Sequence, residues 1–272
     1  MKILLLAVIF FAYESGARVI EDDCNEIAVH NINHEKEQLL HIRNSPYQLA
    51  IDYNTNVLFF SFSNEKGSTL LNSAYLNLKT GEYFVIKDVK GGFANAVDHK
   101  TNTVYLGGSN GIYKFNYDTK KSEHLDGTTH NIWQLFYKDN LYYTTYPDEN
   151  LYLFKDGKYE KVPELSDTRV LLAAIDNNNN IYFSNSSGLY VHKRVKNYDS
   201  FLGDYNLNSF ASDINGNLYF STPTDIYYID GQNIERLASM DNIYGMAIEN
   251  DGSILIADYE NIFRLKPSKK QC

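Results

Sequence analysis

The sequence predicts an all-β protein folded as a six-bladed β-propeller whose last blade is completed by an N-terminal strand. Six similar segments follow one another at intervals of 36 to 46 residues, a period typical of propellers, solenoids and repeat arrays. Each segment holds several short strand-like stretches separated by polar turns, as a propeller blade does. The chain also carries 23 Tyr and 15 Phe but five Pro, and aromatic rings favour strands. Helical periodicity is absent, so helical repeats of this length fit poorly.

The first strand of each blade is an apolar run that ends, except in the third blade, on Asp or Glu. The last residues of these runs lie 46, 39, 39, 37 and 36 positions apart. This regular spacing predicts that all six strands occupy the same place in their blades, around a central tunnel. The runs are PYQLAID (46–52), GFANAVD (92–98), NIWQLFY (131–137), VLLAAID (170–176), LNSFASD (207–213) and IYGMAIE (243–249).

The second and third strands follow a turn rich in Asn, Asp and Gly, residues that tolerate tight turn geometry. One aromatic column marks the third strand in every blade, and we interpret this column as packing between blades rather than as ligand contacts. A weaker fourth strand closes most blades, as in EYFVI (82–86) and YEKVP (159–163). The aromatic column is Tyr75, Tyr113, Tyr152, Tyr190, Tyr227 and Phe263.

The last blade lacks a fourth strand of its own, because the chain ends soon after IFRLKP (262–267). A strand-like stretch, EKEQLLHI (35–42), precedes the first blade and belongs to no repeat. We expect this stretch to form the missing outer strand, since such closure removes an exposed sheet edge.

The first 17 residues have the pattern of a secretory signal peptide. Lys2 precedes an apolar run over 3–12, which is too short to span a bilayer, and small residues at 15–17 offer a cleavage site. Residues 18–272 then form a single propeller domain, which we expect to be secreted and extracellular.

Cysteine usage agrees with secretion. The mature chain has two cysteines, Cys24 and Cys272, separated by 247 residues, and in an oxidising compartment we expect them to form a disulfide. Such a bond requires the two ends to meet, which ring closure would achieve. Asn185 begins an Asn-Ser-Ser sequon between two predicted strands and is a possible glycosylation site.

Several functions are disfavoured by composition and by missing motifs. The net charge is −9 with no Lys/Arg-rich patch, so neither nucleic acid nor a membrane surface is an expected partner. No G-x-S-x-G, H-E-x-x-H or P-loop motif occurs. The seven histidines are not paired at metal-ligand spacing. We therefore predict no catalytic residue, no metal and no cofactor.

The starts of the inner strands carry aromatic side chains together with a few polar ones. Such walls are typical of small-molecule pockets, and flat conjugated ligands stack on rings. Alternatively, the rings pack against one another and plug the tunnel. Arg169 could pair with an anionic group of a ligand, or it could form a surface salt bridge. The predicted ligand-binding residues are Tyr47, Phe93, Trp133, Tyr146, Tyr244 and Tyr259, with Gln48, Asn95, His130, Gln134 and Arg169.

The predicted architecture of this chain is similar to that of six-bladed propellers of the gluconolactonase and paraoxonase kind. Those enzymes hold a divalent metal on the axis through Glu, Asn and Asp at the starts of inner strands. Here no carboxylate occupies the corresponding starts, and Asn208 alone cannot hold a hard cation. Metal-dependent lactone hydrolysis is therefore disfavoured, although it stays open as an alternative.

Six segments carry a second and longer resemblance: RNSPYQLAID (43–52), NVLFFSFS (56–63), GGFANAVD (91–98), NTVYLGGSNGIYKFNYDTKK (102–121), HNIWQLFYKDNLYYT (130–144) and FRLKPSKKQC (263–272). They resemble the ommochrome-binding proteins, which are haemolymph pigment carriers of moths. The resemblance implies a secreted, non-enzymatic carrier of an ommochrome or a related tryptophan- and kynurenine-derived small molecule. A protein-interaction propeller is a third possibility, because fold alone does not settle function.

Overall fold

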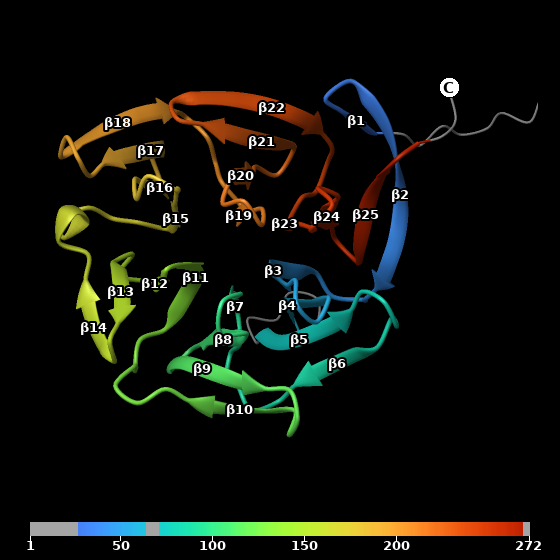
Figure 1. The fold of residues 1–272 in the computed structure, drawn as a ribbon, viewed down its shortest axis with the longest axis horizontal. Helices are drawn as coiled ribbons and strands as arrows, with labels where there is room; N and C mark the ends of the chain where they lie inside the picture. The colour runs from blue at the N-terminus through green and yellow to red at the C-terminus, as the bar shows by residue number, and fades with distance from the viewer. Residues whose placement is uncertain (1–26, 64–70, 269–272) are drawn as a thin grey trace, which may run out of the picture.

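The computed structural model describes residues 27–63 and 71–268, which form a ring of six antiparallel sheets around a central axis (Figure 1). The predicted six-bladed propeller is confirmed. The signal peptide and the Cys24–Cys272 disulfide lie outside the described residues and stay predictions.

Each blade runs from an inner strand at the axis to an outer strand at the rim. Blade 1 contains β3 (Pro46–Asp52), β4 (Val57–Ser63), β5 (Leu71–Asn77) and β6 (Tyr83–Ile86). Blade 2 contains β7 (Ala94–Asp98), β8 (Thr103–Gly108), β9 (Gly111–Asn116) and β10 (Lys121–His124). Blade 3 contains β11 (Ile132–Lys138), β12 (Asn140–Thr145), β13 (Leu151–Lys155) and β14 (Lys158–Lys161), followed by the short 3₁₀ helix η1 (Pro163–Leu165).

The second half of the ring follows the same order. Blade 4 contains β15 (Leu172–Ile175), β16 (Ile181–Asn185), β17 (Gly188–Lys193) and β18 (Tyr198–Gly203). Blade 5 contains β19 (Ser209–Ser212), β20 (Leu218–Ser221), β21 (Asp225–Asp230) and β22 (Asn233–Ser239). Blade 6 contains β23 (Gly245–Ile248), β24 (Ile254–Ala257) and β25 (Asn261–Pro267), together with β2 (Ile32–His41) and β1 (Ile27–Val29) from the beginning of the chain.

The ring closes as predicted, through the N-terminal strand. In Figure 1 the blue strand β2 lies along the red strand β25, and their antiparallel register runs from His34↔Pro267 to His41↔Asn261. The closing strand begins three residues earlier than expected, at Ile32. Blade 6 also gains a fifth strand, β1, which the sequence did not reveal because its three residues are too short to show a period.

The turns that leave the inner strands depend on the acidic residues predicted there. The Oδ1 atom of Asp176 accepts hydrogen bonds from the backbone N–H groups of Asn178 and Asn180, at 2.9 and 2.8 Å. Its Oδ2 atom accepts the Asn180 side-chain amide at 2.8 Å. Asp213 holds the equivalent turn in blade 5 in the same way. Short acidic side chains are favoured at such positions because they satisfy turn N–H groups that no strand can pair.

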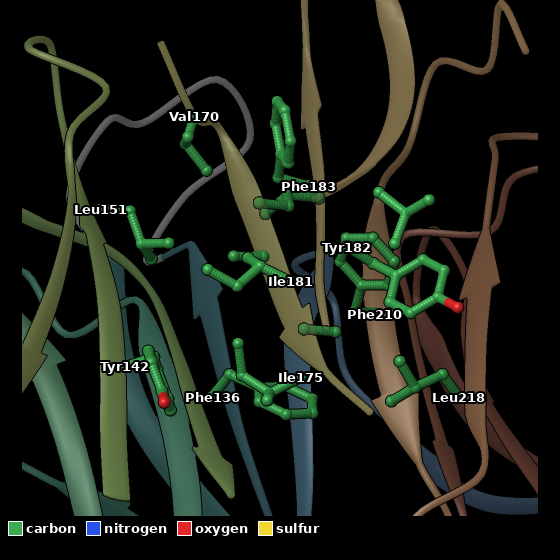
Figure 2. Packing of buried hydrophobic residues seen from close by; sticks show 14 of the residues in the cluster. Phe136, Tyr142, Leu151, Val170, Ile175, Ile181, Tyr182, Phe183, Phe210 and Leu218 are labelled. Atoms are coloured by element: carbon green, nitrogen blue, oxygen red, sulfur yellow. The ribbon is translucent and has the colours of Figure 1, made fainter. Parts of the chain in front are cut away.

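The core consists of five apolar clusters that lie between neighbouring blades. Figure 2 shows one part of it, where Phe136 and Tyr142 of blade 3 face Ile175 and Ile181 of blade 4. The aromatic column lies on the third strands and stacks on the second strands, for example Tyr152 on Tyr143 at 5.1 Å between ring centroids. Equivalent stacks join Tyr190 to Phe183 and Tyr227 to Phe220. Cross-strand aromatic pairs of this kind stabilise sheets. Among the described residues, no helix has the length and apolar character needed to cross a membrane.

Candidate functional site

A cavity of about 780 Å³ opens at the end of the ring where the inner strands begin. It is bounded by inner-strand starts of blades 1, 2, 3 and 6 and by connections between second and third strands. Its volume falls within the roughly 300–1,000 Å³ typical of small-molecule sites. The lining residues are Arg43, Asn44, Ser45, Tyr47, Ser63, Leu71, Gly91, Phe93, Ser109, Asn131, Ile132, Trp133, Tyr146, Tyr244 and Tyr259.

All six predicted aromatic residues line this cavity, and they touch one another in sequence as an arc. Starting in blade 3, Tyr146 lies 5.2 Å from Trp133, and Trp133 lies 4.7 Å from Phe93 of blade 2, between ring centroids. The spacing of neighbouring rings in the arc lies within the usual range for aromatic contacts.

The arc continues through blade 1 into blade 6. Tyr47 lies 6.0 Å from Phe93 and 5.5 Å from Tyr244, which in turn lies 6.2 Å from Tyr259. The rings at the two ends, Tyr146 and Tyr259, are 47% and 42% exposed, whereas the four central rings are half-buried. The arc therefore offers ring faces that are held in place by their neighbours and remain open to the cavity.

Burial changes the acidity of one ring in the arc. Desolvation, followed by the neighbouring hydroxyls of Tyr47 and Tyr259, raises the pKa of Tyr244 above its ordinary value. Tyr244 therefore stays neutral at physiological pH and can donate a hydrogen bond from its hydroxyl group.

Two rings of the arc stand on β-bulges. The pairing of β3 with β4 shifts register between Tyr47 and Ala50, and the pairing of β11 with β12 shifts between Ile132 and Gln134. A bulge changes the direction of a side chain and is common near functional sites. In blade 1 the bulge places Gln48 at φ 49°, a left-handed conformation that costs a non-glycine residue on the order of 1 kcal/mol.

Unlike the aromatic residues, the polar residues predicted at this mouth do not line the larger cavity. Asn95 is buried, and its Nδ2 donates to the carbonyl of Gln48 at 2.7 Å, which holds the blade 1 bulge in place. Gln134 is also buried, and it exchanges two hydrogen bonds with the backbone of Ala173, at 3.0 and 2.7 Å. These amides join neighbouring blades and do not line the cavity. Gln48 itself lines a second cavity, described below.

His130 and Arg169 also lie away from the cavity lining. The ring of His130 stacks on Tyr152 at 4.8 Å, within blade 3. Arg169 is exposed and its Nε donates to Glu149 Oε2 at 2.7 Å. This is the surface salt bridge that the sequence left open as the alternative for Arg169.

The cavity has a cationic residue that sequence reasoning missed. Arg43 lies in the connection between the closing strand β2 and the first inner strand β3, together with Asn44 and Ser45. The connection is fixed to blade 6, because Ser45 Oγ donates to the carbonyl of Tyr259 at 3.1 Å and Ile42 N–H donates to the carbonyl of Glu260 at 2.7 Å. The signal was present in the sequence, since a chain that leaves an outer strand for an inner one must cross this end of the ring.

A smaller cavity of about 320 Å³ lies on the other side of the arc, toward blades 4 and 5. It shares Tyr47, Phe93, Trp133 and Tyr244 with the larger one. Its remaining lining residues are Gln48, Leu171, Leu172, Asn206, Leu207 and Asn208.

Within residues 27–63 and 71–268, His, Cys, Asp and Glu side chains do not gather in groups of three or more that could hold a metal ion. Asn208, which stands at an inner-strand start, donates from Nδ2 to the carbonyl of Ile243 at 2.6 Å. The side chains at this mouth are therefore suited to stacking and hydrogen bonding.

Comparison with known proteins gives one relative in sequence and several in fold. The chain is 37% identical over 278 residues to the ommochrome-binding protein of Manduca sexta, an alignment that covers 99% of this chain and all of that protein. No family model matches the chain.

Among solved structures, a gluconolactonase from Xanthomonas campestris is similar, with a TM-score of 0.69 at 13% identity, covering 90% of this chain and 96% of that one. A luciferin-regenerating enzyme gives a TM-score of 0.64 at 12% identity, covering 86% and 95%. At these identities the structural likeness shows a shared propeller fold.

Proposed function

This chain belongs to the ommochrome-binding protein family, and we propose that it is a secreted carrier that binds an ommochrome or a related tryptophan-derived pigment without chemical change. The observation that carries the proposal is the arc of six aromatic rings beside a cavity of about 780 Å³. A planar conjugated ligand gains most by stacking on rings that are already in place, because the protein loses little conformational freedom on binding.

Arg43 supplies the charge that such a ligand would need. Ommochromes carry amino-acid tails, and a carboxylate pairs well with a guanidinium group. Arg43 is exposed at the cavity and forms no ion pair with another described residue. It is also the only charged side chain among the described residues that line this cavity. We therefore propose that Arg43 binds the anionic group of the ligand, which is the role first considered for Arg169.

The alternative function is a lactonase or related hydrolase, and the shared fold favours it. The residues at the mouth favour a carrier instead, because rings and amides occupy the inner-strand starts where a divalent cation would need carboxylates. The signal-peptide pattern supports secretion, and extracellular localisation is part of the proposal.

The sole tryptophan of the chain makes the proposal directly testable, because Trp133 lies in the arc. Titration of the purified protein with xanthommatin is expected to quench its tryptophan fluorescence and to shift the visible absorbance of the pigment. Trp133→Ala should weaken binding, measured by absorbance, at least about 5-fold, since stacking on one aromatic side chain contributes about 1–3 kcal/mol. Arg43→Gln should also weaken it.

Tyr198→Ala is the matched control, because Tyr198 is an exposed aromatic residue on the outer strand β18 and lies far from the arc. It should bind the pigment as the unmodified protein does. If the pigment spectrum does not change at micromolar protein, or if all four proteins bind equally, the carrier proposal is wrong. Steady turnover of a lactone by the same preparation would favour the hydrolase.

A further inference from the structure

We infer that the smaller cavity is a second ligand site, which takes a compact, uncharged aromatic molecule bearing amide-like groups. The inference does not depend on the pigment proposal, because the residues that distinguish this cavity, Gln48, Leu171, Leu172, Asn206, Leu207 and Asn208, do not line the larger one. Its volume of about 320 Å³ is at the low end of small-molecule sites.

The walls of the two cavities differ in charge. Four rings of the arc form one wall of both, so each cavity can hold a flat molecule against Tyr47, Phe93, Trp133 or Tyr244. The larger cavity adds Arg43, whereas the side chains lining the smaller one are all uncharged. An ionised ligand would lose its hydration in the smaller cavity without gaining a partner, and this favours a neutral one.

The residues that line only the smaller cavity carry either apolar or amide side chains. Leu171, Leu172 and Leu207 supply the apolar surface. Asn208 lies beside them, and its Nδ2 already donates to the carbonyl of Ile243, which leaves its amide oxygen to accept an N–H group from a ligand.

Gln48 provides the second polar group of the cavity, and its backbone conformation indicates that the surrounding structure holds it in place. Its backbone is held at φ 49° by the bulge and by the hydrogen bond from Asn95 to its carbonyl. Its side-chain amide has no hydrogen-bond partner among the described residues. Left-handed backbone at a non-glycine residue persists where the surroundings enforce it, and such positions gather at binding sites.

The test uses indole-3-acetamide, a neutral two-ring molecule with one amide, and isothermal titration calorimetry on the full-length mature protein. We expect saturable binding of one equivalent. Gln48→Gly should weaken binding at least 10-fold while the thermal unfolding midpoint stays the same or rises, because glycine adopts the left-handed conformation freely. Leu207→Trp, which fills the cavity, should abolish binding.

Two further variants separate this site from the larger cavity. Gln48→Asn tolerates the same backbone and keeps a shorter amide, so it should retain more affinity than Gln48→Gly. Ser109→Trp fills the larger cavity only and should leave indole-3-acetamide binding unchanged. Loss of binding in Ser109→Trp with retention in Leu207→Trp would overturn the inference, as would equal affinity for all variants or no binding to the unmodified protein. None of these outcomes involves the pigment, so the two proposals fail independently.

Discussion

One arginine in the last strand bridges the seam between the two ends of the chain, and its removal should destabilise the ring. Arg264 on β25 donates through Nε and Nη2 to the carboxylate of Glu249, and through Nη1 to Glu37 on the closing strand β2 at 2.7 Å. The side chains of Arg264 and Glu249 are only 16% and 15% exposed. Arg264→Met would keep most of the aliphatic packing and would leave Glu249 unpaired in a site that is largely buried.

The size of the effect follows from these contacts. Removing one partner of a buried pair costs about 3–5 kcal/mol. Glu37 is more exposed and keeps Lys266 as a partner at 2.6 Å, so the lower end of that range applies. We expect Arg264→Met to lower the free energy of unfolding by about 3 kcal/mol. For a domain of this size, that corresponds to a midpoint about 6–12 °C lower.

The assay is thermal and urea unfolding of the full-length mature protein, followed by circular dichroism. The double variant Arg264→Met/Glu249→Gln should recover part of the loss, because it no longer buries an uncompensated charge. Lys100→Met, which removes the exposed Lys100–Asp139 pair, should leave the midpoint unchanged. If Arg264→Met also leaves the midpoint unchanged, or if the double variant is less stable than the single one, the seam does not depend on this pair.

Three other predictions concern the stability of the ring. Hydrogen bonding by Lys266 and Arg264 holds the pKa of Glu37 below its ordinary value of 4.5. The contribution of Glu37 to stability is therefore complete above pH 4.5 and is lost as the pH falls through the lowered pKa. Glu37→Gln should flatten this acid dependence, measured by urea unfolding at a series of pH values. Gly111→Ala should destabilise the ring by more than about 3 kcal/mol in urea unfolding, because its φ is 131° and a Cβ atom would clash with the carbonyl oxygen of Thr128. Gly157→Ala is the control: its φ is 75° and open space surrounds it, so it should cost about 1 kcal/mol. Peptide mapping without reduction should recover Cys24 joined to Cys272, and reduction should cost on the order of 4–5 kcal/mol by loop entropy, so recovery of both as free thiols would contradict the disulfide.

The disulfide prediction has geometric support from the described ends of the chain. Ile27 pairs with His34, and His34 pairs with Pro267. The first and last described strands are therefore separated by a single strand, or about 10 Å.

The sequence predicted the ring and the aromatic arc because both follow from the repeat. A residue at the start of an inner strand faces the tunnel mouth in every blade, so Tyr47, Phe93, Trp133 and Tyr244 could be brought together from spacing alone. Tyr146 and Tyr259 were assigned to the same mouth from the loops that follow second strands. Their placement needed no knowledge of how neighbouring blades touch.

The polar part of the site was harder to predict, because it depends on distances between blades. Asn95 bonds to the backbone of the preceding blade and Gln134 to that of the following blade. A pattern within one blade carries no information on such distances. The bulge at Gln48 shifts the register of one strand without any motif in the sequence. Arg43 was missed because it belongs to a connection outside the repeat.

The larger cavity draws its walls from both ends of the chain. Ser45 and Tyr259, which both line it and are joined by a hydrogen bond, are 214 positions apart in sequence. A chain still being synthesised has blades 1 to 3 long before blade 6, and it therefore lacks Tyr244, Tyr259 and the support that holds Arg43. If the proposed pigment binding is correct, binding requires a completed and closed ring, and a chain truncated before blade 6 should not bind the pigment.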